Sequence, residues 1–311
     1  MKAARIHAYG ASSEIRIEDA PLPTLNEDDV LIRVVATSVN PVDWKIRKGY
    51  LKSFIPYEMP LTMGWDVSGV VEKTGPAVTK FKLGDAVYSR PDIRRNGAYA
   101  EYVAVCESEI AFKPTTISHV EAASLPLVSI TAWESLFTAA SLSKGQRVLI
   151  HAGAGGVGSI AVQLARAKGA HVTATASAGK AALVRSLGAD VVIDYRSQDF
   201  SKLARDMDVV FDTIGGEVQE KSWSTLKPGG TLVSITDRPS EDRAKAEGKR
   251  AAYVFIDPNA PILTDLAAMV DLGQVRPLIA AEFGLNDTAK AQDFSETGRA
   301  TGKVVIYVGQ P

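Results

Sequence analysis

One segment of the sequence combines small residues in a spacing that suits the binding of a phosphate group. His151–Gly158 reads HAGAGGVG and contains glycines in the pattern G-x-G-x-x-G. In such a turn the first glycine permits a tight bend, the second lets the backbone approach a pyrophosphate, and the third lets a helix pack closely on a strand. Amide groups at the start of the following helix then attract the negative charge. The residues predicted to bind a dinucleotide here are Gly153, Gly155, Gly156, Val157 and Gly158.

The residues on either side of this turn predict the context that the motif needs. Arg147–His151 is an apolar run typical of a strand, and Val157–Lys168 repeats apolar residues at helical spacing. Gly169 follows where the end of a helix favours a left-handed backbone. A glycine turn without a ligand is the alternative, because such turns are common. The strand before it and the helix after it favour dinucleotide binding.

The end of the next predicted strand, His171–Ala176, indicates which dinucleotide is bound. Sites for NAD commonly place Asp or Glu there, against the ribose hydroxyls. Thr173–Lys180 contains no carboxylate; it contains Ser177 and Lys180, whose hydroxyl and ammonium groups suit a 2′-phosphate. Tyr195 follows the next strand and is a third candidate for this contact. We therefore predict NADPH as the cofactor, with a solvated Lys180 as the alternative.

Two textures along the chain predict two domains. Up to residue 121, short strand-like runs alternate with turn-forming residues, which predicts an antiparallel β-rich domain. From residue 122 to 258, strands alternate with helices, which predicts an α/β fold with a doubly wound parallel sheet. Residues 259–311 return to the mixed texture. Ser118 followed by Glu121 predicts a capping box at a helix start. The strands predicted after the glycine turn are 171–176, 191–194, 209–212, 231–235 and 254–256.

Composition narrows the classes of function. The chain has 311 residues and a net charge of −1, with no run of basic residues that would suit nucleic acid or a membrane anchor. Cys106 is the only cysteine, so an intrachain disulfide and a multi-cysteine zinc site are both excluded. We find no secretion signal and no apolar segment long enough to cross a bilayer. We expect a soluble, cytoplasmic protein.

Several motifs occur in an order that is more specific than the glycine turn alone. They are Ser38–Lys45, Gly64–Gly69, Gly97–Tyr102, Thr131–Trp133, His151–Gly158, Asp212–Gly216 and Gly302–Val305. With these motifs, essentially the whole chain resembles the medium-chain dehydrogenase/reductase superfamily, in its zinc-free quinone oxidoreductase and alkenal (enone) reductase branch. The resemblance implies a GroES-like catalytic domain over residues 1–121 and 259–311, and a Rossmann NADP-binding domain over residues 122–258.

The positions that correspond to metal ligands in zinc-dependent relatives predict an enzyme without zinc. Those relatives typically hold the metal with an early Cys, a His in a Gly-His-Glu segment and a later Cys. By resemblance, Asn40, Trp65 and Leu127 stand at these positions. None of the four histidines forms a ligand-spaced pair with another. Without a Lewis acid, hydride transfer needs an acceptor that spreads charge by conjugation, such as a quinone or an α,β-unsaturated carbonyl compound.

Further site residues are nominated by the resemblance or by their place at strand ends. Asn40 replaces a metal ligand, so we expect it to polarise the substrate oxygen; an Asn-Pro turn is the alternative. Tyr50 is expected to line the pocket or donate a proton, with ordinary packing as the alternative. The resemblance places Lys45, otherwise a solvated residue, against the cofactor and Thr131 against the nicotinamide. The residues expected beside the nicotinamide, or otherwise in the sheet core, are Ile214, Ile235 and Thr236.

Three functions stay open on the sequence alone. The first is an NADPH-dependent enone or alkenal reductase that adds hydride to the β-carbon. The second is a quinone reductase, by two-electron or one-electron steps. The third is a non-catalytic, NADPH-binding regulatory protein on the same fold. The glycine turn and the polar Asn40 segment favour the enzymes. We also expect a lid or a solvated loop at Arg90–Asn96, and a homodimer formed through an edge strand at Val254–Ile256.

Overall fold

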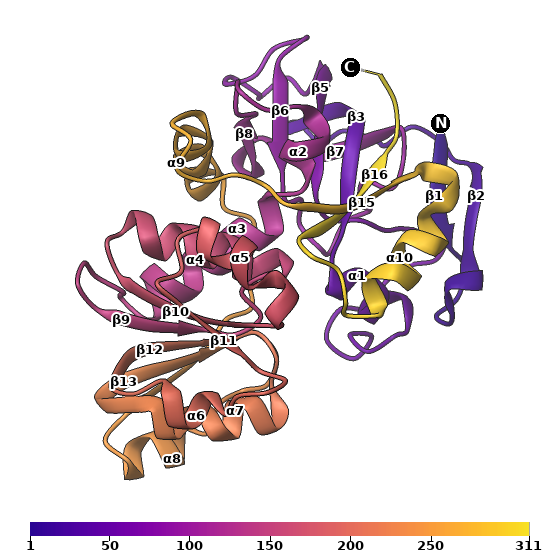
Figure 1. Cartoon of the computed structure of the whole chain (residues 1–311). Helices are drawn as coiled ribbons and strands as arrows, with labels where there is room; N and C mark the ends of the chain where they lie inside the picture. The colour runs from indigo at the N-terminus through magenta and orange to yellow at the C-terminus, as the bar shows by residue number, and fades with distance from the viewer. Residues whose placement is uncertain (311) are drawn as a thin grey trace. The chain divides into compact units, whose positions relative to one another are not determined.

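The computed structural model describes residues 1–310, and these divide into two units (Figure 1). Unit 1 comprises residues 1–127, 257–273 and the chain from residue 277 onward. Unit 2 comprises Val128–Ile256 together with Gln274–Arg276. The sequence had placed the domain boundaries after residues 121 and 258. Among residues 1–310 no helix has the length and apolar character needed to cross a membrane.

Unit 2 is built on a six-stranded sheet in the order β11-β10-β9-β12-β13-β14, with every pair of neighbours parallel. Counted from β9, this is the order 3-2-1-4-5-6 of the Rossmann fold, so the predicted fold class is confirmed. The order reverses between β9 and β12, and dinucleotides bind such sheets at the carboxyl ends of the strands around that reversal. The strands are β9 (Arg147–Ile150), β10 (His171–Ala176), β11 (Val191–Asp194), β12 (Met207–Asp212), β13 (Leu226–Ser234) and β14 (Arg250–Tyr253).

Helices cover both faces of this sheet. In Figure 1, α3, α4 and α5 lie on one face, and α6, α7 and α8 lie on the other. Every residue of the central strand β12 is therefore buried, as expected for a parallel sheet between two helical layers. The helices are α3 (Pro126–Trp133, continued by a π-helical segment, Glu134–Ala139), α4 (Gly156–Ala167), α5 (Ala181–Ser186), α6 (Phe200–Leu203), α7 (Gly216–Ser222) and α8 (Glu241–Ala246).

The last strand of the sheet differs from its prediction. The apolar run Val254–Ile256 suggested a strand, but β14 lies at Arg250–Tyr253, where it pairs with Thr231–Ser234 of β13. The pairing of β13 with β14 begins before the apolar run. The amide of Gly229 bonds the carbonyl of Gly248 (2.7 Å), and this bond sets the register of the two strands. The sheet edge expected to carry a dimer contact is therefore formed by less apolar residues.

Unit 1 contains two sheets that are mostly antiparallel. The small sheet has the order β2-β1-β4, and the seven-stranded sheet has the order β15-β16-β3-β5-β6-β8, with β7 also paired to β3. The strands are β1 (Lys2–Ile6), β2 (Ile15–Asp19), β3 (Asp29–Val39), β4 (Leu61–Thr62), β5 (Val67–Thr74), β6 (Ala86–Ser89), β7 (Tyr102–Cys106), β8 (Ile110–Phe112), β15 (Ile279–Gly284) and β16 (Lys303–Tyr307). The helices are α1 (Pro41–Arg47), α2 (His119–Ala123), α9 (Ala260–Asp271) and α10 (Thr288–Glu296).

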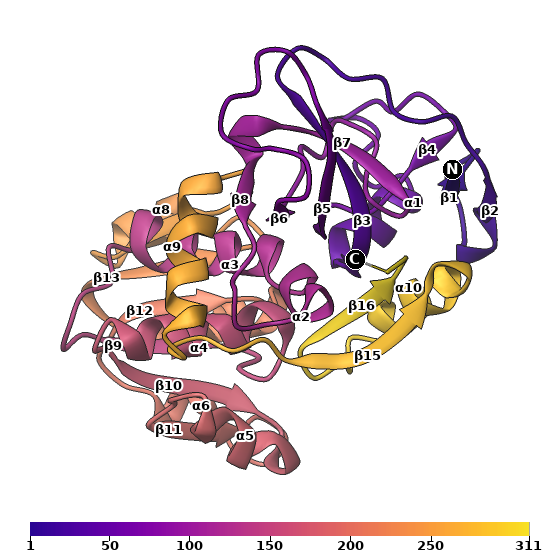
Figure 2. The ribbon, with the colours of Figure 1, turned by 90° about the horizontal axis from the view of Figure 1, so that it is seen from above.

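Near the end of the chain, β16 returns to the seven-stranded sheet that contains the early strand β3. Figure 2 shows the C-terminal strand β16 beside β3, and the two pair in antiparallel register from Val304↔Val39 to Tyr307↔Ala36. The predicted capping box of α2 is also confirmed, because Ser118 and Glu121 each bond the other's backbone amide. The return of residues after Asp257 to unit 1 brings Lys303 next to the residues that follow β3.

Candidate cofactor-binding and active site

The glycine turn joins the carboxyl end of β9 to the start of α4. A Cβ on Gly158 would overlap the carbonyl oxygen of Ala152, so helix and turn can be this close only without a side chain there. A Cβ on Gly153 would lie 2.9 Å from the Cβ of Ala174 on the neighbouring strand. Gly155 precedes the helix and offers it no side-chain acceptor, which leaves the first amides of α4 able to bind a ligand.

The tight bend itself belongs to a different residue from the one that the motif suggests. Ala152 has the left-handed backbone (φ 50°), whereas Gly153 does not. Ala152 is held there because its amide bonds the hydroxyl of Thr175 (3.1 Å) and the amide of Gly153 bonds the carbonyl of Thr175 (2.9 Å). The expectation that Gly153 permits the bend is therefore wrong. Gly153 is required for packing against β10, which spacing alone does not reveal.

The loops after β10 and β11 leave the sheet side by side. Ala176 and Asp194, the last residues of these strands, are paired, and the amide of Tyr195 bonds the carbonyl of Ala176 (3.3 Å). Ser177 and Lys180 belong to one turn, in which the amide of Lys180 bonds the carbonyl of Ser177 (2.9 Å). Three predicted 2′-phosphate contacts thus come from adjacent loops at the carboxyl edge of the sheet.

Asp212 organises the loops after β12 and β13, a role that the sequence reasoning missed. Its buried carboxylate accepts hydrogen bonds from the amides of Ile214 and Gly215 (both 2.9 Å) and from the hydroxyl of Ser234 (2.9 Å). The side chain of Ile214 is held half in solvent, 50% exposed. This exposure excludes the sheet-core alternative for Ile214. Ile235 and Thr236 follow β13 and are only partly buried. Thr131 is buried on α3 and does not lie at a strand end.

In unit 1, Asn40 lies at the start of α1 and is fully buried. Its backbone amide bonds the carboxylate of Asp43 (2.7 Å), and Pro41 occupies the first helical position. Asn-Pro-x-Asp is thus a helix start rather than an isolated turn, and the Asp three residues after Asn40 was the signal that could have predicted α1.

The side chain of Asn40 is bonded at both ends to other buried groups. Its Nδ2 donates to Asp66 Oδ2 (2.8 Å), and its Oδ1 accepts a hydrogen bond from Lys303 Nζ. Lys303 Nζ also donates to the carbonyl of Val39 (3.0 Å) and to Asp66 Oδ2 (3.2 Å). The other oxygen of Asp66 accepts the amide of Leu127 (2.7 Å). We call Asn40, Asp66 and Lys303 the ammonium cluster. Lys303 belongs to the Gly302–Val305 motif, but its bond to Asn40 was not predicted from the sequence.

A second buried carboxyl group lies next to this cluster. Asp43 Oδ2 accepts the hydroxyl of Tyr99 (2.7 Å) as well as the amide of Asn40, while within residues 1–310 its Oδ1 has no hydrogen-bond partner. Burial raises the pKa of Asp43 from 3.8 to about 7, and the hydrogen bond from Tyr99 only partly opposes this. Below about pH 7 the folded protein therefore favours the neutral carboxyl at this position.

Lys45 and Tyr50 lie on α1 and just beyond it. The amide of Tyr50 bonds the carbonyl of Lys45 (3.0 Å), so the two predicted residues are held together. The Tyr50 side chain is 62% exposed, which argues against the packing alternative. The ammonium of Lys45 lies 5.7 Å from the centroid of the Trp44 ring, a cation–π distance. Both side chains remain accessible, in contrast to Asn40.

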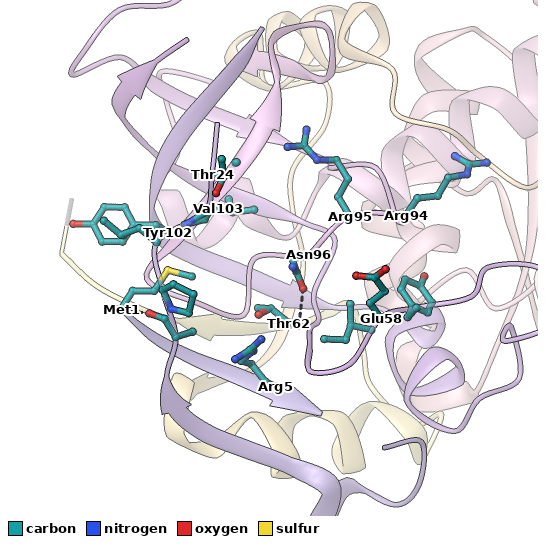
Figure 3. Close-up of a pocket in the computed structure, with 18 of the residues that line it drawn as sticks. Met1, Arg5, Thr24, Glu58, Thr62, Arg94, Arg95, Asn96, Tyr102 and Val103 are labelled. Carbon is teal, nitrogen blue, oxygen red and sulfur yellow. Dashed lines mark hydrogen bonds between the residues drawn. The ribbon is translucent and has the colours of Figure 1, made fainter. Parts of the chain in front are cut away.

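Unit 1 also has a groove of about 670 Å³, to which no predicted site residue contributes (Figure 3). Arg95 binds Asp29 with two hydrogen bonds of 2.7 Å, and Arg94 pairs with Asp92 (3.2 Å). Asn96 Oδ1 accepts a hydrogen bond from the backbone amide of Thr62, which is dashed in Figure 3. The charged side chains of the loop expected to form a lid are thus engaged by neighbours in the same unit.

Comparison with known proteins connects these features. The family model described as an alcohol dehydrogenase GroES-like domain matches residues 26–115, and the one described as a zinc-binding dehydrogenase matches residues 187–306. The chain is 38% identical to the 2-methylene-furan-3-one reductase of Solanum lycopersicum over 99% of this chain and 79% of that protein. It is 39% identical to the NADPH-dependent alkenal/one oxidoreductase of Arabidopsis thaliana, with the same coverage.

The chain belongs to the medium-chain dehydrogenase/reductase superfamily. Its relatives place it in the quinone oxidoreductase and enone reductase branch, and it is an oxidoreductase on this fold, as the sequence predicted. A quinone oxidoreductase from Coxiella burnetii has a similar structure, with a TM-score of 0.91, 34% identity and 99% of each chain covered. A mycobacterial relative solved in complex with NADPH has a TM-score of 0.88 and 28% identity, over 99% of this chain and 100% of that one.

Proposed function

We propose that this medium-chain reductase transfers hydride from NADPH to α,β-unsaturated carbonyl compounds or quinones, without zinc. The observation that carries the proposal is the ammonium cluster, because Asn40, which by resemblance stands at a metal-ligand position of zinc-dependent relatives, is bonded there to the ammonium of Lys303. The tomato and Arabidopsis relatives are named for a methylene-furanone and for alkenals and enones. Each of these names describes a conjugated acceptor.

The residues at the carboxyl edge of unit 2 fit a dinucleotide. Gly155 and Gly158 let the start of α4 pack closely on the turn, and the amides of Gly156 and Val157 can receive the pyrophosphate. Ser177, Lys180 and Tyr195 hold the 2′-phosphate in this proposal. NADPH, when bound, supplies the hydride for the reduction. Ile214, Ile235 and Thr236 form the wall beside the nicotinamide, with Lys45 and Thr131 as the further contacts implied by the family.

A zinc ion does not fit the ammonium cluster. The oxygens of Asn40, Asp66 and Val39 all accept hydrogen bonds from one lysine ammonium, which already neutralises the buried carboxylate. Trp65, at the position of the ligand histidine, is fully buried and has only an N–H donor. Without a metal to polarise a simple carbonyl, the acceptor must delocalise the developing charge itself.

The residues of unit 1 have different roles in the proposed reaction. Asn40 fixes the start of α1 through its backbone amide, which bonds Asp43. Its side chain is buried and bonded within the cluster, and the second N–H of that side chain is our candidate to polarise a substrate oxygen. Tyr50 is exposed, forms part of the acceptor site and is the candidate to donate the final proton. For an enone, the reduction adds hydride at the β-carbon and a proton at the α-carbon.

One assay tests the function directly. NADPH absorbance is followed with alkenals, cyclic enones, quinones and simple ketones, each with and without a chelator. We expect turnover of the conjugated acceptors only, unchanged by the chelator. Tight NADPH binding without oxidation by any acceptor would instead identify a non-catalytic binder. Loss of turnover with the chelator would refute the zinc-free mechanism.

Assembly and location remain separate parts of the proposal. We propose a homodimer that uses the edge of the unit 2 sheet at β14, whose outer side has no strand partner within residues 1–310. Sedimentation as a monomer at micromolar concentration would contradict it. We also propose a cytoplasmic location, although several named relatives are chloroplastic or mitochondrial; fractionation of the source cells tests this.

A further inference from the structure

Arg196 lies directly after Tyr195, at the carboxyl end of β11, and none of the contacts proposed so far uses it. Its guanidinium carbon lies 5.8 Å from the centroid of the Tyr195 ring. The Arg196 side chain is exposed and, within residues 1–310, no carboxylate forms a direct ion pair with it; its contact with Tyr195 and a weaker attraction to Asp194 raise its pKa. We infer that Arg196 binds the 2′-phosphate of NADPH and contributes to the selection of NADPH over NADH, an inference that rests on the proposed cofactor.

The backbone around Arg196 holds it beside the predicted phosphate contacts. The pairing of Ala176 with Asp194, and the bond from the Tyr195 amide to the Ala176 carbonyl, join the loop of Arg196 to the loop of Ser177. Arg196 therefore comes one residue after Tyr195, whose backbone amide is bonded to the end of β10. Only its side chain needs to turn for the guanidinium to approach the turn that carries Ser177.

A carboxylate in the same place would be expected to repel a phosphate, and Asp194 is such a group. Its oxygens, however, accept hydrogen bonds from the hydroxyl of Ser197 (2.7 Å) and from the amide of Arg196 (3.2 Å). These two bonds, with a further one from the amide of Ala178, lower the pKa of Asp194. The carboxylate thus stays ionised and joins the two loops through their amides. It holds the backbone of Arg196 and attracts the guanidinium without forming a direct ion pair with it.

The chemistry of the two side chains suits a phosphate monoester. A guanidinium donates two parallel hydrogen bonds to phosphate oxygens and remains charged at every physiological pH. The Tyr195 ring beneath it limits its freedom through a cation–π contact, so less order has to be created on binding. NADH has a hydroxyl where NADPH has the 2′-phosphate, and a hydroxyl offers no charge for Arg196 to bind.

A binding experiment with two nucleotides isolates this contact. Adenosine 2′,5′-bisphosphate and 5′-AMP differ only in the 2′-phosphate, and calorimetric titration measures the affinity of the whole chain for each. We expect Arg196→Ala to weaken binding of the bisphosphate about tenfold and binding of 5′-AMP less than about twofold. Arg196→Lys keeps the charge but not the paired donors, so it should retain only part of the affinity.

A matched control removes the same kind of charge at the opposite end of the strands, near the amino end of β12. Arg205 is exposed and lies just before β12, and its Nε donates a hydrogen bond to the carbonyl of Lys202 (3.2 Å). Arg205→Ala should leave both affinities unchanged, and thermal unfolding of each variant checks the fold. Equal weakening of the two nucleotides by Arg196→Ala would assign Arg196 to the adenosine moiety and overturn the inference.

The same data separate this inference from the proposed cofactor. A wild-type chain that binds the bisphosphate no more tightly than 5′-AMP would contradict the NADPH assignment itself, and with it the role of Arg196. A wild-type preference for the bisphosphate that survives intact in Arg196→Ala would overturn the role of Arg196 alone. The NADPH assignment would then rest on Ser177, Lys180 and Tyr195.

Discussion

The polar groups at the strand ends of unit 2 and those of the ammonium cluster in unit 1 differ in what already binds them. At the strand ends, backbone amides at the start of α4 keep free bonding capacity, and the side chains of Tyr195 and Ile214 are half exposed. In the cluster, Asn40 and Lys303 are buried and bonded to each other. The first region is suited to receive a ligand, while the second is suited to fix the backbone that carries Lys45 and Tyr50.

We expect the largest effect from removing the ammonium of Lys303. Lys303→Met leaves the buried carboxylate of Asp66 without its counter-charge, and breaking a buried ion pair in this way typically lowers stability by about 3–5 kcal/mol. The free energy of unfolding in urea measures the loss. The double variant Lys303→Met/Asp66→Asn removes both charges and should recover most of it. A loss of less than about 1 kcal/mol in the single variant would show that the pair is not a structural one.

A methyl group at the glycine turn tests the other region. Gly158→Ala places a Cβ against the carbonyl of Ala152, and over-packing of backbone typically lowers stability by about 1–3 kcal/mol. We expect NADPH affinity to fall with it, because the turn must move. Gly284→Ala, at the end of β15, is the matched control, since among residues 1–310 a Cβ there meets nothing within 4 Å. Fluorescence titration with NADPH reads out both variants; equal affinities would contradict the packing argument.

The raised pKa of Asp43 predicts a pH dependence that is confined to unit 1. Its folded-state pKa of about 7 lies above the reference value of 3.8, so its contribution to stability is fully present below about pH 3.8 and is lost as the pH rises through about 7. Asp43→Asn cannot titrate. Its stability relative to the wild type should therefore rise by about 1.4 kcal/mol per pH unit within this window. Parallel stability curves for the two proteins from pH 4 to 8 would contradict the assignment; exposed Asp242→Asn is the control.

The smallest expected effect concerns the cofactor preference. Lys180→Ala removes one of the proposed charges on the 2′-phosphate and should raise the KM for NADPH about tenfold, equivalent to about 1.4 kcal/mol, with little change for NADH. Lys202→Ala, an exposed substitution on α6, serves as the control. An unchanged ratio of the two KM values would refute the assignment of Lys180.

The sequence predicted the elements best where a local pattern decides them. Strands β10 and β11 were located to the residue, because each is a short apolar run bounded by turn-forming residues. The start of β14 was placed four residues late, since its register depends on Gly229 and Gly248 rather than on its own apolar residues. Local pattern therefore predicts that a strand exists more reliably than where it begins.

The candidate site shows the same division. The glycine turn and the loops that follow β10 and β11 could be predicted, because the strand order of the sheet brings them to one edge. The role of Lys303 could not be predicted, since 263 residues separate it from Asn40 and neither residue type specifies the other. The left-handed backbone of Ala152 could not be predicted for a related reason, because the hydrogen bond that holds it comes from Thr175 on another strand.

The pairing of β16 with β3 has a consequence for the order in which the protein forms on the ribosome. Unit 2 is almost continuous in sequence, so its sheet can assemble as soon as its last strand has emerged. Unit 1 must wait, because β3 lacks its neighbour β16 until Lys303–Tyr307 has been synthesised, after the whole sheet of unit 2. During that interval the buried carboxylate of Asp66 lacks its ammonium partner, and the edge of β3 that β16 will cover has unpaired backbone groups.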